Sequence, residues 1–354
     1  MLTNMSKRGG KVNMKYPNSL KKGDSIGLIA PTEGCSSTKK QRYLDLAIKN
    51  MNKIGLNVVE GKNIRNMKYL VSDTAKNRAD EFIRFFKDEN IKYIFSVAGG
   101  SFLIDILPYL DERKDEIKAV KNIKYFHGYS DNSLLNMYLT TNFNIPTVNG
   151  QTFTHFCMKD LDKSLENILD FMFLAGKEFK QTNFKKWELD EFDNRVKGYN
   201  LTKRVKYKVL DENKKKIQVS GRIIGGCLEA THQLIGTNFD NVANFCKKQE
   251  EGVIWYIDIF EDDAVSIYSK LNQMKNAGWF ENVKAILIGR TYGGKAFRDF
   301  DYICALKKAL YDLNVPVIYD VDIGHTVPQL TLINGSLAFV TYENNKFEIV
   351  QKFV

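Results

Sequence analysis

The sequence predicts an α/β fold in two parts: an N-terminal Rossmann-like domain with a parallel sheet, and a C-terminal β-rich α+β domain. Short apolar runs alternate with longer stretches of helical periodicity from Ser25 to about residue 141, which is typical of βαβ crossovers. The last part of the chain carries closely spaced strands instead. With 354 residues, the chain has a length at which two domains are the usual arrangement.

In the first part, each predicted strand is followed by a predicted helix. Residues 25–30 form a buried strand that Pro31 ends, and residues 39–54 carry apolar side chains at helical spacing. The later elements are a strand at 57–60, a helix at 74–88, a strand at 92–97, a helix at 102–110, a strand at 123–127 and a helix at 132–141. Ligands bind beyond the carboxyl ends of strands in such sheets, so Gly99-Gly100 and Ser130 lie where we expect a site.

The predicted division of the chain is a loose tail at 1–17, the Rossmann-like domain at 18–160, a linker or insert at 161–205 and the C-terminal domain at 206–354. In the last of these, residues 205–210 and 216–220 are predicted to pair as a hairpin, and Gly225-Gly226-Cys227-Leu228 to open a helix. The remaining predicted elements are strands at 252–259, 283–288, 315–319, 329–333, 337–342 and 346–350, with helices at 262–275 and 297–311.

Composition and charge exclude several classes of protein. The net charge is +10, but the lysines are scattered and no nucleic-acid-binding signature accompanies them, so we expect a solvated basic surface that favours anionic small substrates. No apolar run approaches the roughly 18 residues that span a bilayer, and the basic N-terminus lacks the apolar core of a secretory signal. The five cysteines are widely spaced and form no C-x-x-C pair, which predicts reduced thiols in a cytoplasmic protein, without a disulfide frame or a zinc site.

Ser130 is the candidate nucleophile. The stretch Phe126-His127-Gly128-Tyr129-Ser130-Asp131 predicts a strand that stops abruptly and turns into a helix. A serine on such a strained turn presents its hydroxyl to a cleft, as in a nucleophile elbow. The elbow pattern usually has glycine two positions later, where this chain has Asn132. The alternative is an ordinary strand–helix turn in which Ser130 or Asp131 caps the helix.

A serine nucleophile needs a base, and His325 is the favoured one of the four histidines. It lies in the glycine-bearing loop Gly324-His325-Thr326, where a side chain can reach across a cleft. The other three histidines, at positions 127, 155 and 232, lie in strand, apolar or helical contexts and are interpreted as structural.

The candidate acid and the candidate oxyanion donors also lie at the ends of predicted strands. Asp258 follows the apolar run 253–257, where a carboxylate is otherwise disfavoured, and would orient the imidazole. Glu261 is the alternative acid. The backbone N–H groups of Gly100 and Asp131 lie at adjacent strand ends and could form an oxyanion hole.

Together these pieces resemble the LD-carboxypeptidase family of serine peptidases, which includes murein tetrapeptide carboxypeptidases and microcin C self-immunity proteins. The resemblance covers residues 21–354 and rests on motifs in the family's order: Gly23-Asp24-Ser25-Ile26-Gly27-Leu28-Ile29-Ala30-Pro31, Ala98-Gly99-Gly100, Gly128-Tyr129-Ser130-Asp131, Gly225-Gly226-Cys227-Leu228 and Gly324-His325-Thr326. It implies a serine–acid–histidine triad of Ser130, Asp258 and His325 between two domains, and a homodimer.

The chain departs from the family pattern at three places. Aspartate stands at position 258, where the family commonly has glutamate, so the acid has a shorter arm. Ala98 replaces an arginine, and Ser101 replaces an aromatic residue. The insert around Trp187 is similar to that of the immunity subgroup, which places an aromatic side chain over the ligand; the alternative is a tryptophan that only packs its loop. The candidate substrate contacts are therefore Gly99, Ser101, Trp187 and Glu261.

The function predicted from these residues is hydrolysis of an amide bond in a small peptide or an aminoacyl-nucleotide, without a metal or an organic cofactor and without a membrane or nucleic-acid partner. The insert favours the microcin C self-immunity subgroup. One alternative is a murein tetrapeptide LD-carboxypeptidase of cell-wall recycling. Another is a homologue that binds peptides or nucleotides but has lost turnover. The aspartate at position 258, where the family commonly has glutamate, is the feature that supports this alternative.

Overall fold

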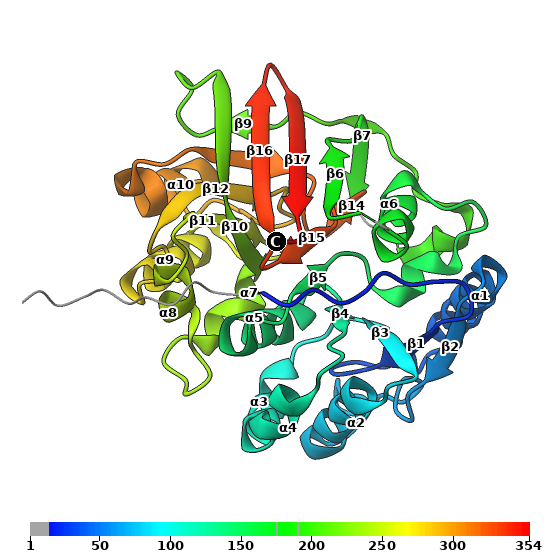
Figure 1. Cartoon of the computed structure of the whole chain (residues 1–354). Helices are drawn as coiled ribbons and strands as arrows, with labels where there is room; N and C mark the ends of the chain where they lie inside the picture. The colour runs from blue at the N-terminus through cyan, green and yellow to red at the C-terminus, as the bar shows by residue number, and fades with distance from the viewer. Residues whose placement is uncertain (1–13, 175, 190–191) are drawn as a thin grey trace, which may run out of the picture.

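The structure, a computed structural model, describes residues 14–174, 176–189 and 192–354. Figure 1 shows the elements of the first half of the chain, blue to green, beside those of the second half, green to red. Helix α5 (Asn132–Phe143) lies between the two halves, and its residues 132–141 are all buried. A helix that is buried all round is a core element rather than a surface one, so α5 joins the two parts of the molecule.

The first sheet has six strands in the order β15-β5-β4-β3-β1-β2. Its parallel strands are β1 (Ser25–Ile29), β2 (Asn57–Glu60), β3 (Ile91–Ser96), β4 (Tyr125–His127) and β5 (Thr147–Asn149). The strand order reverses at β1, and ligands bind at the carboxyl edge beside such a reversal in open α/β sheets. The predicted parallel α/β sheet is confirmed.

Helices cover both faces of this sheet. They are α1 (Thr38–Ile54), α2 (Ala75–Lys87), α3 (Leu107–Glu112), α4 (Lys114–Ala119), α5 and α6 (Lys163–Met172), with short 3-10 turns η1 (Leu103–Ile106) and η2 (Phe153–Cys157). Helix α1 begins after Ser37, whose side chain accepts from the Lys40 N–H, and ends at Gly55 in the left-handed region. The single helix predicted at 102–110 is divided between η1 and α3.

The second sheet has eight strands in the order β6-β17-β16-β10-β11-β12-β13-β9. They are β6 (Glu178–Thr182), β9 (Lys208–Val209), β10 (Lys216–Cys227), β11 (Val253–Asp258), β12 (Val283–Gly289), β13 (Val317–Val321), β16 (Leu337–Glu343) and β17 (Lys346–Lys352). The four central strands, β10 to β13, are parallel. Its helices are α7 (Leu228–Thr231), α8 (Val242–Lys247), α9 (Ala264–Asn276) and α10 (Tyr302–Leu310), with 3-10 turns η4 (His232–Leu234) and η5 (Tyr311–Leu313).

In the second half, one prediction is wrong and one predicted helix begins later than expected. Strands β9 and β10 do not form a hairpin, because β9 pairs with β13 at one edge while β10 lies between β16 and β11. The helix predicted to open at Gly225-Gly226-Cys227-Leu228 is present as α7, but it begins only at Leu228, because the glycine pair lies inside β10. A Cβ at Gly225 would lie 1.8 Å from the Tyr256 carbonyl oxygen, and one at Gly226 would lie 2.5 Å from Ser133 Cβ. Both glycines are therefore required for β10 to contact β11 and α5 closely.

The chain crosses back to the first sheet near its end. The strand predicted at 329–333 is β15 (Leu332–Asn334), which pairs antiparallel with β5 rather than with its neighbours in the sequence. Residues 161–205, expected to be a linker or insert, contain α6, β6, β7 (Lys186–Leu189), η3 (Phe192–Lys197) and β8 (Lys203–Arg204). Strand β6 pairs with β17, and β7 pairs with β14 (Thr326–Val327). The insert therefore packs beside the loop that carries His325.

The remaining global predictions concern membranes and cysteines. Within the described ranges, no helix combines the length and the apolar character needed to cross a membrane. All five cysteines are free thiols; Cys304 is exposed and the other four are buried.

Candidate active site

Ser130 lies on a strained turn between β4 and α5. Its φ is 62°, in the left-handed region, which costs a non-glycine residue about 1–2 kcal/mol. A Cβ at Gly128 would lie 2.8 Å from Asn132 Cβ, so glycine is required for the chain to turn this sharply. The positive end of the α5 dipole faces the same region. The conformation is that of a nucleophile elbow rather than of a capping serine.

His325 reaches Ser130 from the other half of the chain. Its Nε2 lies 2.9 Å from Ser130 Oγ, within hydrogen-bond distance. It stands between β13 and β14, directly after Gly324, whose φ is 89°. A Cβ at Gly324 would lie 1.7 Å from Asp258 Oδ1, so only glycine lets the histidine loop lie against that carboxylate.

Asp258 lies behind His325, at the carboxyl end of the buried strand β11. Its Oδ2 is 2.9 Å from His325 Nδ1, and the aspartate is 1% exposed. The imidazole N–H is not aligned with this oxygen closely enough for a straight hydrogen bond, as is common for catalytic hydrogen bonds without substrate. The shorter aspartate arm thus still places an oxygen against the base. Glu261, the alternative acid, is exposed three residues further on.

The predicted oxyanion donors lie around Ser130. A Cβ at Gly99 would lie 3.2 Å from Ser130 Oγ, so the glycine backbone touches the nucleophile. A Cβ at Gly100 would lie 1.9 Å from Thr32 Oγ1, which ties this loop to the one after β1. Neither the Gly100 nor the Asp131 N–H donates to another residue of the described chain. Both amides are thus available for an oxyanion.

Asn132 connects the Ala98-Gly99-Gly100 loop to the turn that carries Ser130. The sequence pattern did not indicate this role. Its Nδ2 donates to the Ala98 carbonyl oxygen (2.9 Å) and to the Tyr129 carbonyl oxygen (3.0 Å). Glycine, the usual residue at this position of the elbow, could make neither bond. The asparagine therefore holds the Ala98-Gly99-Gly100 loop against the serine turn.

Asp131 is buried next to Ser130, and the pKa of its carboxyl group is raised. Its Oδ2 accepts from the Leu103 N–H at 2.9 Å. Burial raises the pKa of Asp131 from 3.8 to about 6, partly opposed by the hydrogen bond from Leu103 and the charge of Arg78. The folded protein therefore binds this proton more tightly than the unfolded chain, and folding loses stability as the pH rises from about 4 to about 6.

Replacing Asp131 with asparagine should stabilise the protein in a pH-dependent way. The variant removes an ionisation that costs about 3 kcal/mol above pH 6 and nothing below pH 4. We expect the free energy of unfolding of Asp131→Asn to exceed that of the wild type at pH 7.5, and the difference to shrink towards pH 4. Urea unfolding at several pH values measures it. A difference independent of pH would contradict the raised pKa.

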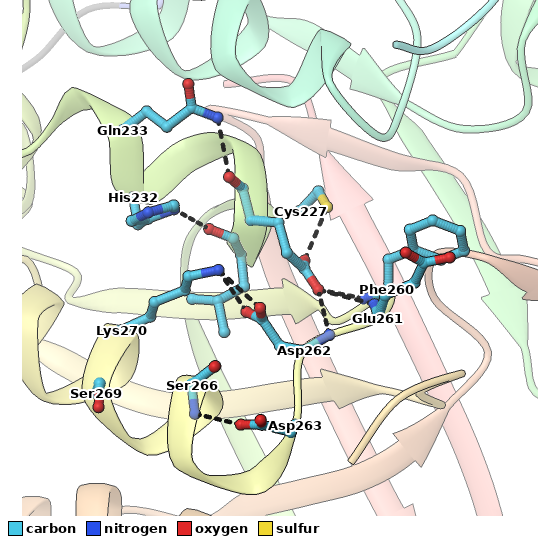
Figure 2. A network of polar contacts seen from close by, with 12 residues as sticks. Cys227, His232, Gln233, Phe260, Glu261, Asp262, Asp263, Ser266, Ser269 and Lys270 are labelled. Atoms are coloured by element: carbon cyan, nitrogen blue, oxygen red, sulfur yellow. Dashed lines mark hydrogen bonds and ion pairs between the residues drawn. The ribbon is translucent and has the colours of Figure 1, made fainter. Parts of the chain in front are cut away.

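The Glu229 carboxylate shapes the loop after Asp258, and the spacing of these residues along the chain does not indicate this contact. Glu229 Oε1 accepts from the N–H groups of three consecutive residues, Phe260 (2.9 Å), Glu261 (3.0 Å) and Asp262 (3.2 Å). Its Oε2 accepts from the Cys227 thiol at 3.2 Å. Figure 2 shows these contacts converging between the start of α7 and the loop after β11. Glu229 thus fixes the loop that follows the acid.

Aromatic rings hold His325 on two sides. The Phe260 ring stacks on the imidazole with centroids 4.1 Å apart, and Tyr129 lies 5.1 Å away at a tilt. Tyr292 continues the row, edge-on to Phe260 at 5.5 Å. Since Glu229 binds the Phe260 N–H, the same carboxylate helps to position the ring that packs on the base. Neither Phe260 nor Tyr292 was a predicted site residue, because nothing in their spacing separates them from core aromatics.

The other predicted substrate contacts lie around this centre with different degrees of exposure. Ser101 and Glu261 are exposed, and Gly99 is half-buried beside Ser130. Trp187 is half-buried on β7, with the Arg290 guanidinium 4.4 Å and Lys203 Nζ 4.7 Å from its ring centroid. Arg290 also donates to Thr326 Oγ1 (3.2 Å), next to His325. Trp187 therefore packs on Arg290, the residue that binds the histidine loop at Thr326. Contact between Trp187 and substrate stays a prediction.

The remaining histidines have the structural contacts expected of them. His127 Nδ1 lies 2.8 Å from the Tyr93 hydroxyl, and full burial lowers the pKa of His127 to about 3. His155 is buried with its Nδ1 2.9 Å from the Tyr199 hydroxyl. His232 Nδ1 contacts the Leu228 carbonyl oxygen at 3.0 Å.

Comparison with known proteins places this geometry among relatives. Residues 26–150 match the LD-carboxypeptidase N-terminal domain, and residues 220–340 match the LD-carboxypeptidase C-terminal domain. The Microcin C7 self-immunity protein MccF of Escherichia coli is 25% identical over 342 residues, 94% of each chain. The "Probable murein peptide carboxypeptidase" of Bacillus subtilis is 23% identical over 335 residues, 93% of this chain and 92% of the relative.

Solved structures share the whole fold. A mutant of MccF in complex with adenosine monophosphate superposes with a TM-score of 0.80 at 23% identity, covering 97% of this chain and 99% of MccF. An MccF-like protein from Streptococcus pneumoniae in complex with AMP gives a TM-score of 0.77 at 22% identity, covering 93% and 99%. The two-domain arrangement is therefore common to these proteins.

Proposed function

Because this chain belongs to the LD-carboxypeptidase family, we propose that it is a serine hydrolase that cleaves an amide bond in a small molecule. The observation that carries the proposal is the continuous row of Ser130, His325 and Asp258, with two successive atom separations of 2.9 Å. Ser130 lies on the turn after β4 of the first sheet, Asp258 ends β11 of the second sheet, and His325 lies in the loop between β13 and β14. Such a row has the spacing that transfers a proton from the serine to the imidazole.

In the proposed reaction, Ser130 Oγ attacks the amide carbonyl carbon while His325 Nε2 takes the hydroxyl proton. Asp258 holds the imidazole with its other proton on Nδ1 and stabilises the imidazolium. The carbonyl oxygen, now negative, accepts from the N–H groups of Gly100 and Asp131 near the positive end of α5. His325 then gives the proton to the leaving nitrogen, and water releases the acyl group from Ser130 by the same steps in reverse.

The substrate that we propose is an aminoacyl group joined through an amide to a nucleotide. MccF structures of the same fold contain AMP or aspartyl sulfamoyl adenosine. In this chain the aromatic row of Phe260 and Tyr292 beside the base offers flat apolar surface of the kind that packs against a planar ring. Strand β7 of the insert pairs with β14 next to His325, so we expect the insert to line one side of the substrate site.

Cleavage of a murein tetrapeptide is the second candidate. It is supported by the 23% identity to the "Probable murein peptide carboxypeptidase" of Bacillus subtilis along 93% of this chain. The same triad would then release a C-terminal D-amino acid. The two candidates differ in the group on the leaving nitrogen, not in the chemistry at Ser130.

Incubation with both compounds decides between them. The protein is incubated with an aminoacyl sulfamoyl adenosine, in which a sulfamate replaces the phosphate, in one reaction and with a murein tetrapeptide in the other. The products are identified by mass spectrometry. We expect release of the amino acid from the nucleoside derivative. Release of D-alanine alone would assign the murein activity, and no product from either compound, without labelling of Ser130 by a fluorophosphonate, would remove the hydrolase proposal.

Trp187 provides a test of the insert. We propose that its ring contributes binding that substrate and transition state share, so Trp187→Ala should raise KM about fivefold, the loss of roughly 1 kcal/mol, with little change in kcat. The melting temperature should also fall, because the ring packs on Arg290. Trp187→Phe, which keeps an aromatic ring, is the matched control. An unchanged KM in the alanine variant would leave Trp187 with packing alone.

A further inference from the structure

A thiol that the proposed reaction does not use lies directly beside the acid and the base. Cys227 ends β10, and the parallel register places it opposite Asp258 at the end of β11. The Cys227 sulfur, an Asp258 carboxylate oxygen and a His325 ring nitrogen all lie within 4.8 Å of one another. The three side chains come from three strand ends, so their spacing along the chain gives no sign of this cluster.

The cluster has unused capacity for a ligand. Asp258 is 1% exposed, and neither of its carboxylate oxygens accepts a well-aligned hydrogen bond from any residue that the structure describes. A buried carboxylate without aligned donors is costly. The Glu229 carboxylate adds negative charge 3.2 Å from the Cys227 sulfur (Figure 2). Two carboxylates next to a thiol favour a dication over a second anion.

We propose that Cys227, Asp258 and His325 form an inhibitory binding site for Zn²⁺, with sulfur, oxygen and Nδ1 as ligands. These are the three ligand types that Zn²⁺ prefers, and a tetrahedral site needs ligand atoms about 3.5 Å apart, which small side-chain rotations supply here. Water can take the fourth position. Binding exchanges the thiol proton, which leaves to solvent, for a sulfur–zinc bond, so no oxidant or reductant is involved.

Inhibition follows from the two nitrogens of one imidazole. Zinc on Nδ1 of the neutral ring leaves the remaining ring proton on Nε2. That proton then faces Ser130 Oγ, 2.9 Å away, and the ring can no longer accept the serine proton. The metal also occupies the Asp258 oxygen that would stabilise an imidazolium. A single bound ion therefore removes both the base and its partner.

The proposal rests on the triad geometry but not on which substrate is cleaved, and metal binding is measured without turnover. Cd²⁺ is added to the Ser130→Ala, Cys304→Ser double variant, which keeps all three ligands and lacks the exposed cysteine. We expect a sulfur-to-cadmium charge-transfer band in the ultraviolet that Zn²⁺ displaces. Adding Cys227→Ser to this background should abolish the band. A band that persists without Cys227, or none with it, overturns the site.

Activity gives the second arm. Zn²⁺ should inhibit hydrolysis, EDTA should restore it, and Mg²⁺, which prefers oxygen ligands, should have no effect. Relative to its own metal-free rate, Cys227→Ser should require at least about tenfold more Zn²⁺ for half-inhibition, whereas Cys304→Ser should match the wild type. Equal sensitivity of the two serine variants would overturn the inhibitory site. If no variant hydrolyses any amide, the proposed function fails while the cadmium band still decides the metal site.

Discussion

Ser130→Ala should lower turnover by about 10⁴-fold or more and abolish labelling by a fluorophosphonate. In the proposed reaction the Ser130 hydroxyl forms the acyl bond, and alanine has no group that could do so. Folding should be unaffected, because alanine at φ 62° keeps the backbone strain of the turn and also keeps the Cβ atom.

The measurement compares turnover and probe labelling in three proteins. Ser269→Ala, an exposed serine in α9, is the matched control and should label as the wild type does. Retained turnover in Ser130→Ala would show that hydrolysis uses another nucleophile. Loss of labelling in Ser269→Ala as well would show that the probe reports folding rather than an activated serine.

Asp258→Asn should lower turnover by about 10³- to 10⁴-fold, somewhat less than loss of Ser130 or His325. The acid only positions and stabilises the base, whereas the other two residues form or break bonds. An asparagine amide next to His325 Nδ1 donates instead of accepting, so the ring proton moves to Nε2 and faces the serine. The wrong tautomer, not a cavity, is the physical cause, because asparagine has nearly the volume of aspartate.

Glu261→Gln is the control that tests the choice of acid. The side chain is exposed and its backbone N–H is held by Glu229, so turnover should stay within a few-fold of the wild type. Thermal unfolding of both variants checks that the fold is kept. A crippled Glu261→Gln beside an active Asp258→Asn would transfer the acid role to Glu261.

Much of the fold was predictable because its signals are local. Apolar runs of four to six residues ended by glycine or proline, followed by segments of helical period, identify β1 to β4 and most of the helices between them, whereas the three-residue strand β5 and the short helix α4 were not predicted. The same reasoning placed Ser130, Asp258 and His325 at strand ends, where a small residue, an acid in an apolar run and a glycine-flanked histidine stand out from their neighbours.

The errors arose where pairing depends on distant residues. Strand β10 was divided between a hairpin and a helix start, although it is one strand of 12 residues. Its glycine pair Gly225-Gly226 resembles a turn signal in the local pattern, but the two glycines permit close contact with Tyr256 and Ser133, which lie far along the chain. Strand β15 likewise completes the first sheet from the far end of the sequence. No short-range periodicity contains that information.

The candidate chemistry follows from the sequence alone, since the chain contains a serine on a sharp turn, an acid at the end of a buried strand and a histidine after glycine. The distances depend on the folded chain: Asp258 reaches His325 despite its shorter side chain because Gly324 lets the histidine loop lie against the carboxylate. The fold also brings Glu229, Phe260 and Cys227 to the same place. These residues belong to the site because parallel strands end at one edge of a sheet, a relation that exists only after β10, β11 and β13 have paired.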